Sequence, residues 1–467
     1  MFCAAAVQRE RPCLNPPPGS ADVKQVSVPV YRGRFGAAQA ERLLWRAGFG
    51  PAPGQAARLS RKGLRHAVRS LTRPRGKAKL RGPAPHDDDG LPLAPGDAWG
   101  HDLLWWLDRM VRSDQPLNER MTLVWHDWFA TADVGQTTLN LKQNELFRKC
   151  GLGSFEELLL AVTVDPAMLV WLSGNENERG APNENYGREL MELFTLGADN
   201  GYSEDDVREQ ARALTGWTND WDESRGMVNF RFERDRHDYG RKSIFGKAGN
   251  FDWRDSCRLC IDHPAHAGFF VTRLWSYFVP TPPPKRTLRA LKQQYRRDRN
   301  IRRIVEAILM HPALYEGPRL VKPPIVQIAG MLRARRRGID TDSWSWIAEE
   351  AGQRLFMPPN VAGWDEQRWL DTARIGGRWT AAAQNTRAAE IDPDGYDPKE
   401  TAADAVRKAL RFWGNPSLSS QTRGELQRFA TRVENVATDD WQQASYRGLR
   451  QNALRILIAV SPEFQTS

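Results

Sequence analysis

Apolar residues recur at helical spacing in one segment after another, and this period constrains the fold more than any other feature of the chain. Spacings of i, i+3 and i+4 run through 101–113, 116–132 and 154–165, as is typical of amphipathic helices. The sequence has no alternation of strands with helices, no Gly-rich phosphate loop and no G-x-S-x-G motif. It therefore predicts a mostly α fold, a multi-helical orthogonal bundle.

One stretch departs from this helical period. Val228, Phe230 and Phe232 alternate with polar residues, and a period of two is typical of a half-buried strand. We therefore expect one small β-hairpin at about residues 227–246.

Breaks in the helical pattern divide the chain into five parts. The Pro- and Arg-rich residues 1–36 are expected to be a disordered lead, followed by N-terminal helices at 37–71. Residues 72–97 are rich in Pro, Gly and charge and read as a linker or loop. We expect a central helical domain with the hairpin at 98–280, and a C-terminal helical lobe at 281–467.

Composition narrows the cellular setting of this chain of 467 residues. No apolar run approaches the roughly 18 residues that a membrane span needs. The apolar start of the chain is too short for a secretory signal, so we expect a cytoplasmic protein. Cys257 and Cys260, followed by His263 and His266, suggest a zinc site, but four ligands within ten residues would be cramped. Structural thiols in a reducing cytoplasm are the better interpretation.

The net charge of +10 is unevenly distributed. Residues 271–340 hold 16 Lys or Arg against 4 Asp or Glu, whereas 175–210 hold 10 acids against 3 Arg. The two blocks either face each other across a lobe interface or mark two binding surfaces. The basic region 285–303 has one aromatic residue, Tyr295, and matches no nucleic-acid-binding motif, so we expect no nucleic-acid partner.

The candidate site lies in "PNENYGRELMELFTLG", residues 182–197. On a helix, Asn185, Glu189 and Glu192 fall on one stripe at the border of the apolar face. Two carboxylates at i, i+3 repel each other unless a cation, a shared proton or hydrogen-bond donors compensate. Helical carboxylate sites present metal ligands at this spacing, and the same groups without metal suit acid–base catalysis.

The start of the same helix has an ordinary explanation. Asn183 is a good N-cap, and Glu184 lies four residues before Arg188, at the spacing of an ion pair. Ser203 and Asp206 form a capping-box pattern for the next helix. If the helix borders a cleft, Asn183 and Glu184 join Asn185 as candidate binding groups.

Histidines complete the candidate set. His126, in "WHDWF", and His237, in "RHDYG", could meet Glu189 and Glu192 in a cleft. Imidazole and carboxylates suit a divalent metal such as Mn, Fe or Zn, and Glu189, Glu192 and His126 are the candidate ligands and catalytic groups. The structural alternatives are a hydrogen-bonded core histidine at 126 and glutamates paired with arginines of other helices. Asp127 is expected to be exposed or to act as a cap.

The chain resembles a large family of bacterial proteins known as domain of unknown function 1800. The resemblance implies a mostly helical fold and supplies no activity. It also implies a partner, the product of a neighbouring gene from a second uncharacterised family. Relatives often carry a second histidine where this chain has Trp128. The matching stretches are "LLWRAGFGP", "ERMTLVWHDWFAT", "DPAMLVWL", "PNENYGRELMELFTLG", "YSEDDVREQARALTGW", "HDYGRKSIFG", "HPAHAGFFVTRLW", "VKPPIVQIAGMLRA", "GQRLFMPPNVAGWDEQRWL" and "SPEFQ".

Two classes of function follow. The first is an enzyme with a carboxylate and histidine cleft, with or without a divalent metal, whose reaction the sequence does not name. The second is a non-catalytic binding or scaffold protein that uses its charged blocks to hold a partner protein or polymer.

Overall fold

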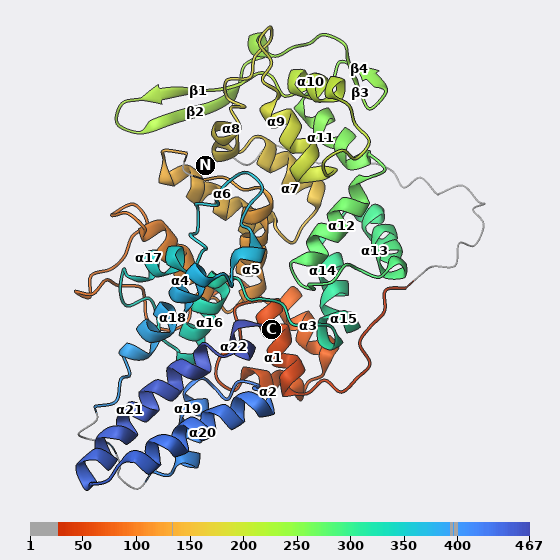
Figure 1. The fold of residues 1–467 in the computed structure, drawn as a ribbon. Helices are drawn as coiled ribbons and strands as arrows, with labels where there is room; N and C mark the ends of the chain where they lie inside the picture. Colours follow the sequence, from red (N-terminus) through yellow and green to blue (C-terminus); the bar gives the residue numbers. More distant parts are fainter. Residues whose placement is uncertain (1–26, 133, 393–395, 397–399) are drawn as a thin grey trace.

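The chain is mostly helical, as the period of its apolar residues predicts (Figure 1). We describe it from a computed structural model that covers residues 27–132, 134–392, 396 and 400–467. Residues 1–26, most of the expected lead, lie outside this description. The helices form an elongated body with the ribbon of β1 and β2 projecting at one end and α19, α20 and α21 at the other.

The first 280 residues contain the stripe of 182–197 and most of the helices around α5 (Pro116–Trp128). The N-terminal helices are α1 (Ala37–Arg46), α2 (Gln55–Ser60) and α3 (Leu64–Thr72). The central helices are α4 (His101–Arg112), α5 (Pro116–Trp128), α6 (Thr137–Cys150), α7 (Phe155–Thr163), α8 (Pro166–Trp171), α9 (Glu184–Glu189), the π-helix η1 (Leu190–Thr195), α10 (Glu204–Ala213), the 3-10 turn η2 (Arg234–Arg236), α11 (Trp253–Asp262) and α12 (His266–Ser276).

The remaining helices form the rest of the body and the far lobe. They are α13 (Lys285–Asp298), α14 (Ile301–Met310), α15 (Pro312–Glu316), α16 (Pro324–Arg335), α17 (Trp344–Glu350), the 3-10 turn η3 (Glu366–Arg368), α18 (Thr372–Arg387), α19 (Ala402–Phe412), α20 (Ser420–Val436), α21 (Asp440–Ala459) and α22 (Pro462–Gln465). No helix in the described residues is long and apolar enough to cross a membrane.

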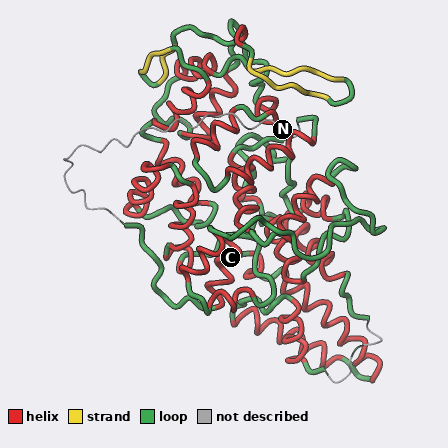
Figure 2. Tube along the Cα trace, turned by 180° about the vertical axis from the view of Figure 1, so that it is seen from behind, coloured by secondary structure: helices red, strands yellow, loops and turns green. Residues whose placement is uncertain are grey.

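The β structure of the described chain is two small antiparallel pairs rather than the one hairpin expected at 227–246 (Figure 2). Strand β1 (Trp217–Asp222) pairs with β2 (Gly226–Phe232), and β3 (Lys242–Ile244) pairs with β4 (Lys247–Gly249). The alternating residues that suggested a strand do form β2. However, β2 pairs with the strand that precedes it, β1, in which apolar and polar residues do not clearly alternate.

Two hydrophobic cores meet along α5. Trp125 and Trp128 of α5 belong to the core that α7, α11, α12 and α14 build. Leu123, on another face of α5, belongs to the core that α4, α16, α17 and the C-terminal helices build. Helix α5 is therefore buried on nearly all sides, and the segments around it define the interior where a site can form.

Part of the basic block forms ion pairs between neighbouring helices. Arg299, at the end of α13, forms ion pairs with Glu156 of α7 and Asp262 of α11. Arg303 pairs with Asp298 at 2.8 Å. Some of the positive charge of residues 285–303 is therefore neutralised by ion pairs that link α13 to α7, α11 and α14.

A buried carboxyl group ties α6 to α8. Asp165 caps α8 by accepting the Met168 amide at 3.2 Å, and it accepts the Gln143 side-chain amide at 2.8 Å. Burial raises the pKa of Asp165 from 3.8 to about 7. Between these two pH values the folded state binds more protons than the unfolded state, so the free energy of unfolding falls as pH rises.

We expect Asp165→Asn to remove this part of the pH dependence, because Asn keeps an acceptor for the cap and has no proton to lose. Relative to the wild type, the variant should gain about 1–3 kcal/mol of stability between about pH 4 and pH 8. Urea denaturation of both proteins at the two pH values measures the difference. If the two proteins differ in free energy of unfolding by the same amount at both pH values, the pKa of Asp165 is not raised.

Candidate functional site

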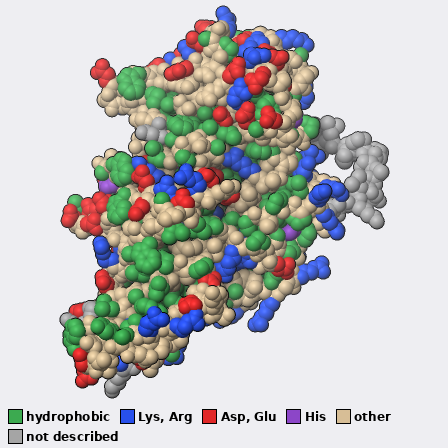
Figure 3. Space-filling view, in the orientation of Figure 1, with side chains coloured by type: hydrophobic (Ala, Val, Ile, Leu, Met, Phe, Trp, Pro, Cys, Tyr) green, Lys and Arg blue, Asp and Glu red, His purple; other side chains and the backbone are tan. Residues whose placement is uncertain are grey.

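The stripe predicted from 182–197 begins with the cap and the ion pair expected there. The Asn183 side chain accepts the Asn185 amide at 2.9 Å and caps α9. Arg188 pairs with Glu184 at 3.2 Å and also with Glu204 of α10 at 2.7 Å. Asn185 itself is exposed. In Figure 3, acidic and basic side chains intermingle over this end of the molecule, so the acidic block is largely matched locally.

The two glutamates of the stripe differ in their partners. Glu192 lies 3.5 Å from Arg188. Glu189 is half-buried, and no described residue lies within hydrogen-bond or ion-pair distance of its carboxylate. Burial first, and then the charge of Glu192, raise the pKa of Glu189. The expected repulsion within the stripe is therefore present, and the nearby charge of Arg188 offsets it only in part at Glu189.

His126 does not join these glutamates. Its side chain is 1% exposed and lies in an aromatic cage, with ring centroids 5.3 Å from Trp106, 5.5 Å from Phe356 and 5.5 Å from Trp364. Burial lowers the pKa of His126 to about 3, so the imidazole is neutral. In the described part of the chain, no three His, Cys, Asp or Glu side chains are grouped so that they could hold a metal ion.

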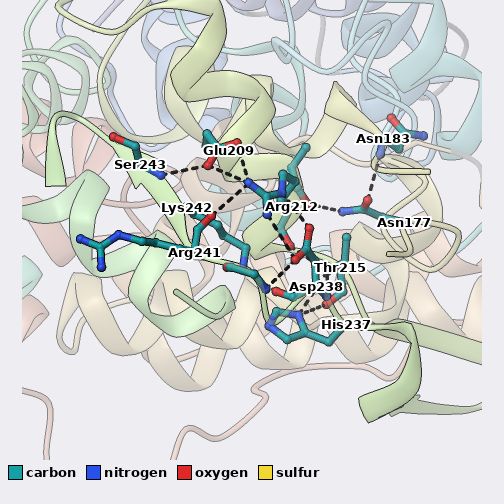
Figure 4. A network of polar contacts seen from close by, with 12 residues as sticks. Asn177, Asn183, Glu209, Arg212, Thr215, His237, Asp238, Arg241, Lys242 and Ser243 are labelled. Carbon is teal, nitrogen blue, oxygen red and sulfur yellow. Dashed lines mark hydrogen bonds and ion pairs between the residues drawn. The ribbon is translucent and has the colours of Figure 1, made fainter. Parts of the chain in front are cut away.

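His237 belongs to a polar network that joins the small sheets to α10 (Figure 4). It is buried, and its Nδ1 lies 2.9 Å from the Thr215 carbonyl oxygen. The neighbouring Asp238 pairs with Arg212 of α10 at 2.7 Å. On the other side of the network, the Asn183 amide donates to Asn177. His237 and Asn183 therefore make separate structural hydrogen bonds at opposite sides of this network and do not contact each other.

The end of the candidate helix is docked onto α5 and α12 through its backbone. Residues 190–195 form a π-helix, and three of its carbonyl groups accept bonds from side chains of the two helices. The Trp128 indole donates to Phe194 at 3.1 Å, the His266 ring nitrogen lies 2.9 Å from the Thr195 oxygen, and Arg273 donates to Leu193. Trp128 thus caps this end of the π-helix.

A cavity of about 250 Å³ lies beside this junction, where α5 and α12 face the chain between 320 and 369. Titratable side chains from all three parts line it. The lining residues are Arg120, Leu123, Val124, Asp127, Arg273, Ser276, Tyr277, Leu320, Val321, Pro323, Gln353, Ala362, Trp364, Asp365, Glu366, Gln367 and Trp369. This cavity contains none of the stripe residues.

Asp127 connects the three walls of the cavity, so the expectation that it is exposed or a helix cap is wrong. Its carboxylate accepts the Tyr277 hydroxyl at 2.5 Å and the Trp364 amide at 2.8 Å. Gly363 has φ of +97°, and a Cβ there would clash with the Asp127 carboxylate and backbone oxygens. A segment more than 200 residues away in sequence therefore covers Asp127, and α5 alone carries no sign of it.

The charged groups of the cavity perturb one another. Burial is the largest cause that raises the pKa of Asp127 and that of Glu366, and the charge of Asp127 raises the pKa of Glu366 further. Burial lowers the pKa of Arg120 to about 10, so it remains charged at neutral pH. Titratable groups perturbed in this way and gathered in one cavity are typical of functional sites.

Sequence reasoning assigned none of these residues to a site, and it gave Asp127 the wrong surroundings. The available signal was the pairing of two motifs, "WHDWF" and "MPPNVAGW". The first places Asp127 on a helix otherwise lined with aromatic residues, and the second places a glycine directly before Trp364. Only their contact in space turns the two motifs into one site.

The comparison with known proteins gives one match. The family model described as Protein of unknown function (DUF1800) matches residues 42–466. No curated protein and no solved structure matches the chain.

We expect Gly363→Ala to cost at least about 2 kcal/mol of stability, because alanine disfavours the positive φ and its Cβ would clash with Asp127. Gly376→Ala is the matched control. Gly376 lies inside α18 with no atom near the position of an added Cβ, so alanine should be neutral or stabilise by about 0.5–1 kcal/mol. Thermal unfolding of the two variants measures both effects, and equal melting temperatures would contradict the packing of Gly363 on Asp127.

Proposed function

Because the chain belongs to the DUF1800 family, whose description names no activity, we propose a function from the chemistry of the cavity. The protein is an enzyme that transfers a proton to or from a small polar substrate, with Asp127 and Glu366 as the acid–base pair. One observation carries the proposal: two carboxyl groups with raised pKa values line the same cavity.

The arrangement suits proton transfer for a physical reason. A general acid or base works best when its pKa lies near the operating pH, and burial moves carboxyl groups toward neutrality. Asp127 is held in place by two donors, Tyr277 and the Trp364 amide, so its orientation is fixed before a substrate arrives. Glu366, on the turn that follows Trp364, is the partner whose proton affinity depends on the charge of Asp127.

The stripe of 182–197 is the rival location for the chemistry. Glu189 also has a raised pKa, and with Glu192 it remains a candidate for acid–base or metal-dependent catalysis. His126 would have to leave its aromatic cage to join them as a ligand. We therefore place the chemistry in the cavity and use the stripe as the control.

A panel of chromogenic esters, glycosides, phosphate esters and amides tests the proposal with five purified proteins: wild type, Asp127→Asn, Glu366→Gln, Glu189→Gln and Glu192→Gln. Any turnover by the wild type should fall about 100-fold or more in the two cavity variants, because an acid–base group contributes about that much. It should stay within about twofold in the two stripe variants.

The opposite pattern, with loss in the stripe variants and retention in the cavity variants, would move the site to Glu189 and Glu192. Elemental analysis of the same preparations then decides whether that site holds a divalent metal. A wild type with no turnover across the panel would favour the binding or scaffold alternative.

A further inference from the structure

Arg120 is a buried cation without a partner. Its side chain lies on α5 at the wall of the cavity, and the residue is 3% exposed. Within the described chain, it makes no side-chain hydrogen bond and no ion pair, and its Nε is buried without an acceptor. A buried charge without direct partners is costly because it has lost water. Burial still lowers the pKa of Arg120, although the nearby charges of Asp127 and Glu366, which form no ion pair with it, favour its charged form.

Arg378 shows how this fold treats a structural arginine at the same depth. It is 2% exposed, and its guanidinium donates to the Trp369 carbonyl at 2.9 Å, to the Lys322 carbonyl at 2.8 Å, and to the side-chain oxygens of Gln327 and Gln465. Burial lowers the pKa of both arginines to about 10. Arg378 donates from all three of its guanidinium nitrogens, whereas Arg120 lines the cavity without such bonds and has the charges of Asp127 and Glu366 nearby.

Arg273 brings a second guanidinium to the same cavity. Its guanidinium carbon lies 4.6 Å from the centre of the Trp128 ring, and it donates to the Leu193 carbonyl. These contacts fix the plane of the group and leave part of its donor fork unused. Each oxygen of Asp127 accepts one hydrogen bond, from Tyr277 or from the Trp364 amide. Burial raises the pKa of Asp127 and the charges of Arg273 and Arg120 offset this in part, but neither arginine forms an ion pair with it among the described residues.

We propose that Arg120 and Arg273 form an oxyanion subsite that binds the carboxylate or phosphate group of the substrate. The inference rests on the proposed function in placing a small substrate in this cavity. Two guanidinium groups with unused donors match the oxygens of either anion, and a bound anion would supply the partner that Arg120 lacks. The anion would sit beside Asp127 and Glu366, next to the acid–base pair.

Isothermal titration and thermal unfolding of the full chain test this subsite with inorganic phosphate and with acetate, against sodium chloride of equal ionic strength. At least one of the two anions should bind the wild type and raise its melting temperature. Arg120→Met should weaken that binding about tenfold or more, because a charge-assisted contact is lost. Arg273→Met should weaken it as well. Phosphate binding alone would identify a tetrahedral anion, and acetate binding alone a carboxylate.

The stability of the anion-free proteins separates a ligand-binding arginine from a structural one. Arg120→Met should be at least as stable as the wild type, whereas Arg378→Met, which breaks four bonds, should be much less stable. Three results would overturn the proposal: no response to either anion, an unchanged response in Arg120→Met, or an Arg120→Met protein as destabilised as Arg378→Met or unable to fold. The two proposals can fail separately. If Arg120→Met loses anion binding while Asp127→Asn keeps its turnover, the acid–base proposal is wrong and the oxyanion subsite is supported.

Discussion

The carboxylate of Asp127 is the contact on which the centre of the molecule depends. It lies on α5, which two cores enclose, and it accepts one hydrogen bond from α12 and one from the backbone of the chain near Trp364. Desolvating a carboxylate is unfavourable, and the two donors offset that cost only in part, as the raised pKa shows. The fold therefore holds a partly desolvated carboxylate at the point where three segments meet, which is typical of a site shaped by function rather than by stability.

The cavity beside Asp127 contains a buried cation that makes no side-chain hydrogen bond and no ion pair among the described residues. Two other buried charged groups are bonded: Arg378 has four hydrogen bonds, and Glu400 pairs with Arg450 and Lys408. Arg120 has none among the described residues, although it is equally buried. Folded proteins seldom leave a buried cation unpaired without a reason. A bound anion is the partner that the geometry of the cavity accommodates.

The sequence predicts the local structure well and the site poorly. Helical periodicity identifies the mostly α fold, and the Asn183 cap, the capping box of Ser203 and the pair of Glu184 with Arg188 are confirmed because each depends on neighbours within four residues. The π-helical turn at 190–195 was not foreseen, because its carbonyl groups are satisfied by side chains of α5 and α12. The second pair of strands was missed for a similar reason, since pairing partners are set by the tertiary structure.

The residues that form the cavity lie far apart in the sequence, which explains why the sequence did not predict it. The Asp127 contact with Trp364 spans 237 residues, and no local pattern encodes it. His126 and Asp127 are adjacent in sequence, yet one lies in an aromatic cage and the other faces a cavity, because successive residues of a helix point about 100° apart. The stripe of Glu189 and Glu192 could be predicted because its residues are close in sequence. Burial and then the charge of Glu192 do raise the pKa of Glu189. A functional role for the stripe is a proposal.

Hydrogen exchange of the segment 356–369 tests the central role of Asp127 most directly. The Trp364 amide bonds to the Asp127 carboxylate, so Asp127→Ala should speed exchange across this segment by about tenfold or more. Exchange in α10, which Asp127 does not contact, should remain unchanged. Equal exchange of 356–369 in the wild type and in Asp127→Ala would contradict the account, because the segment would then be held over α5 without the carboxylate.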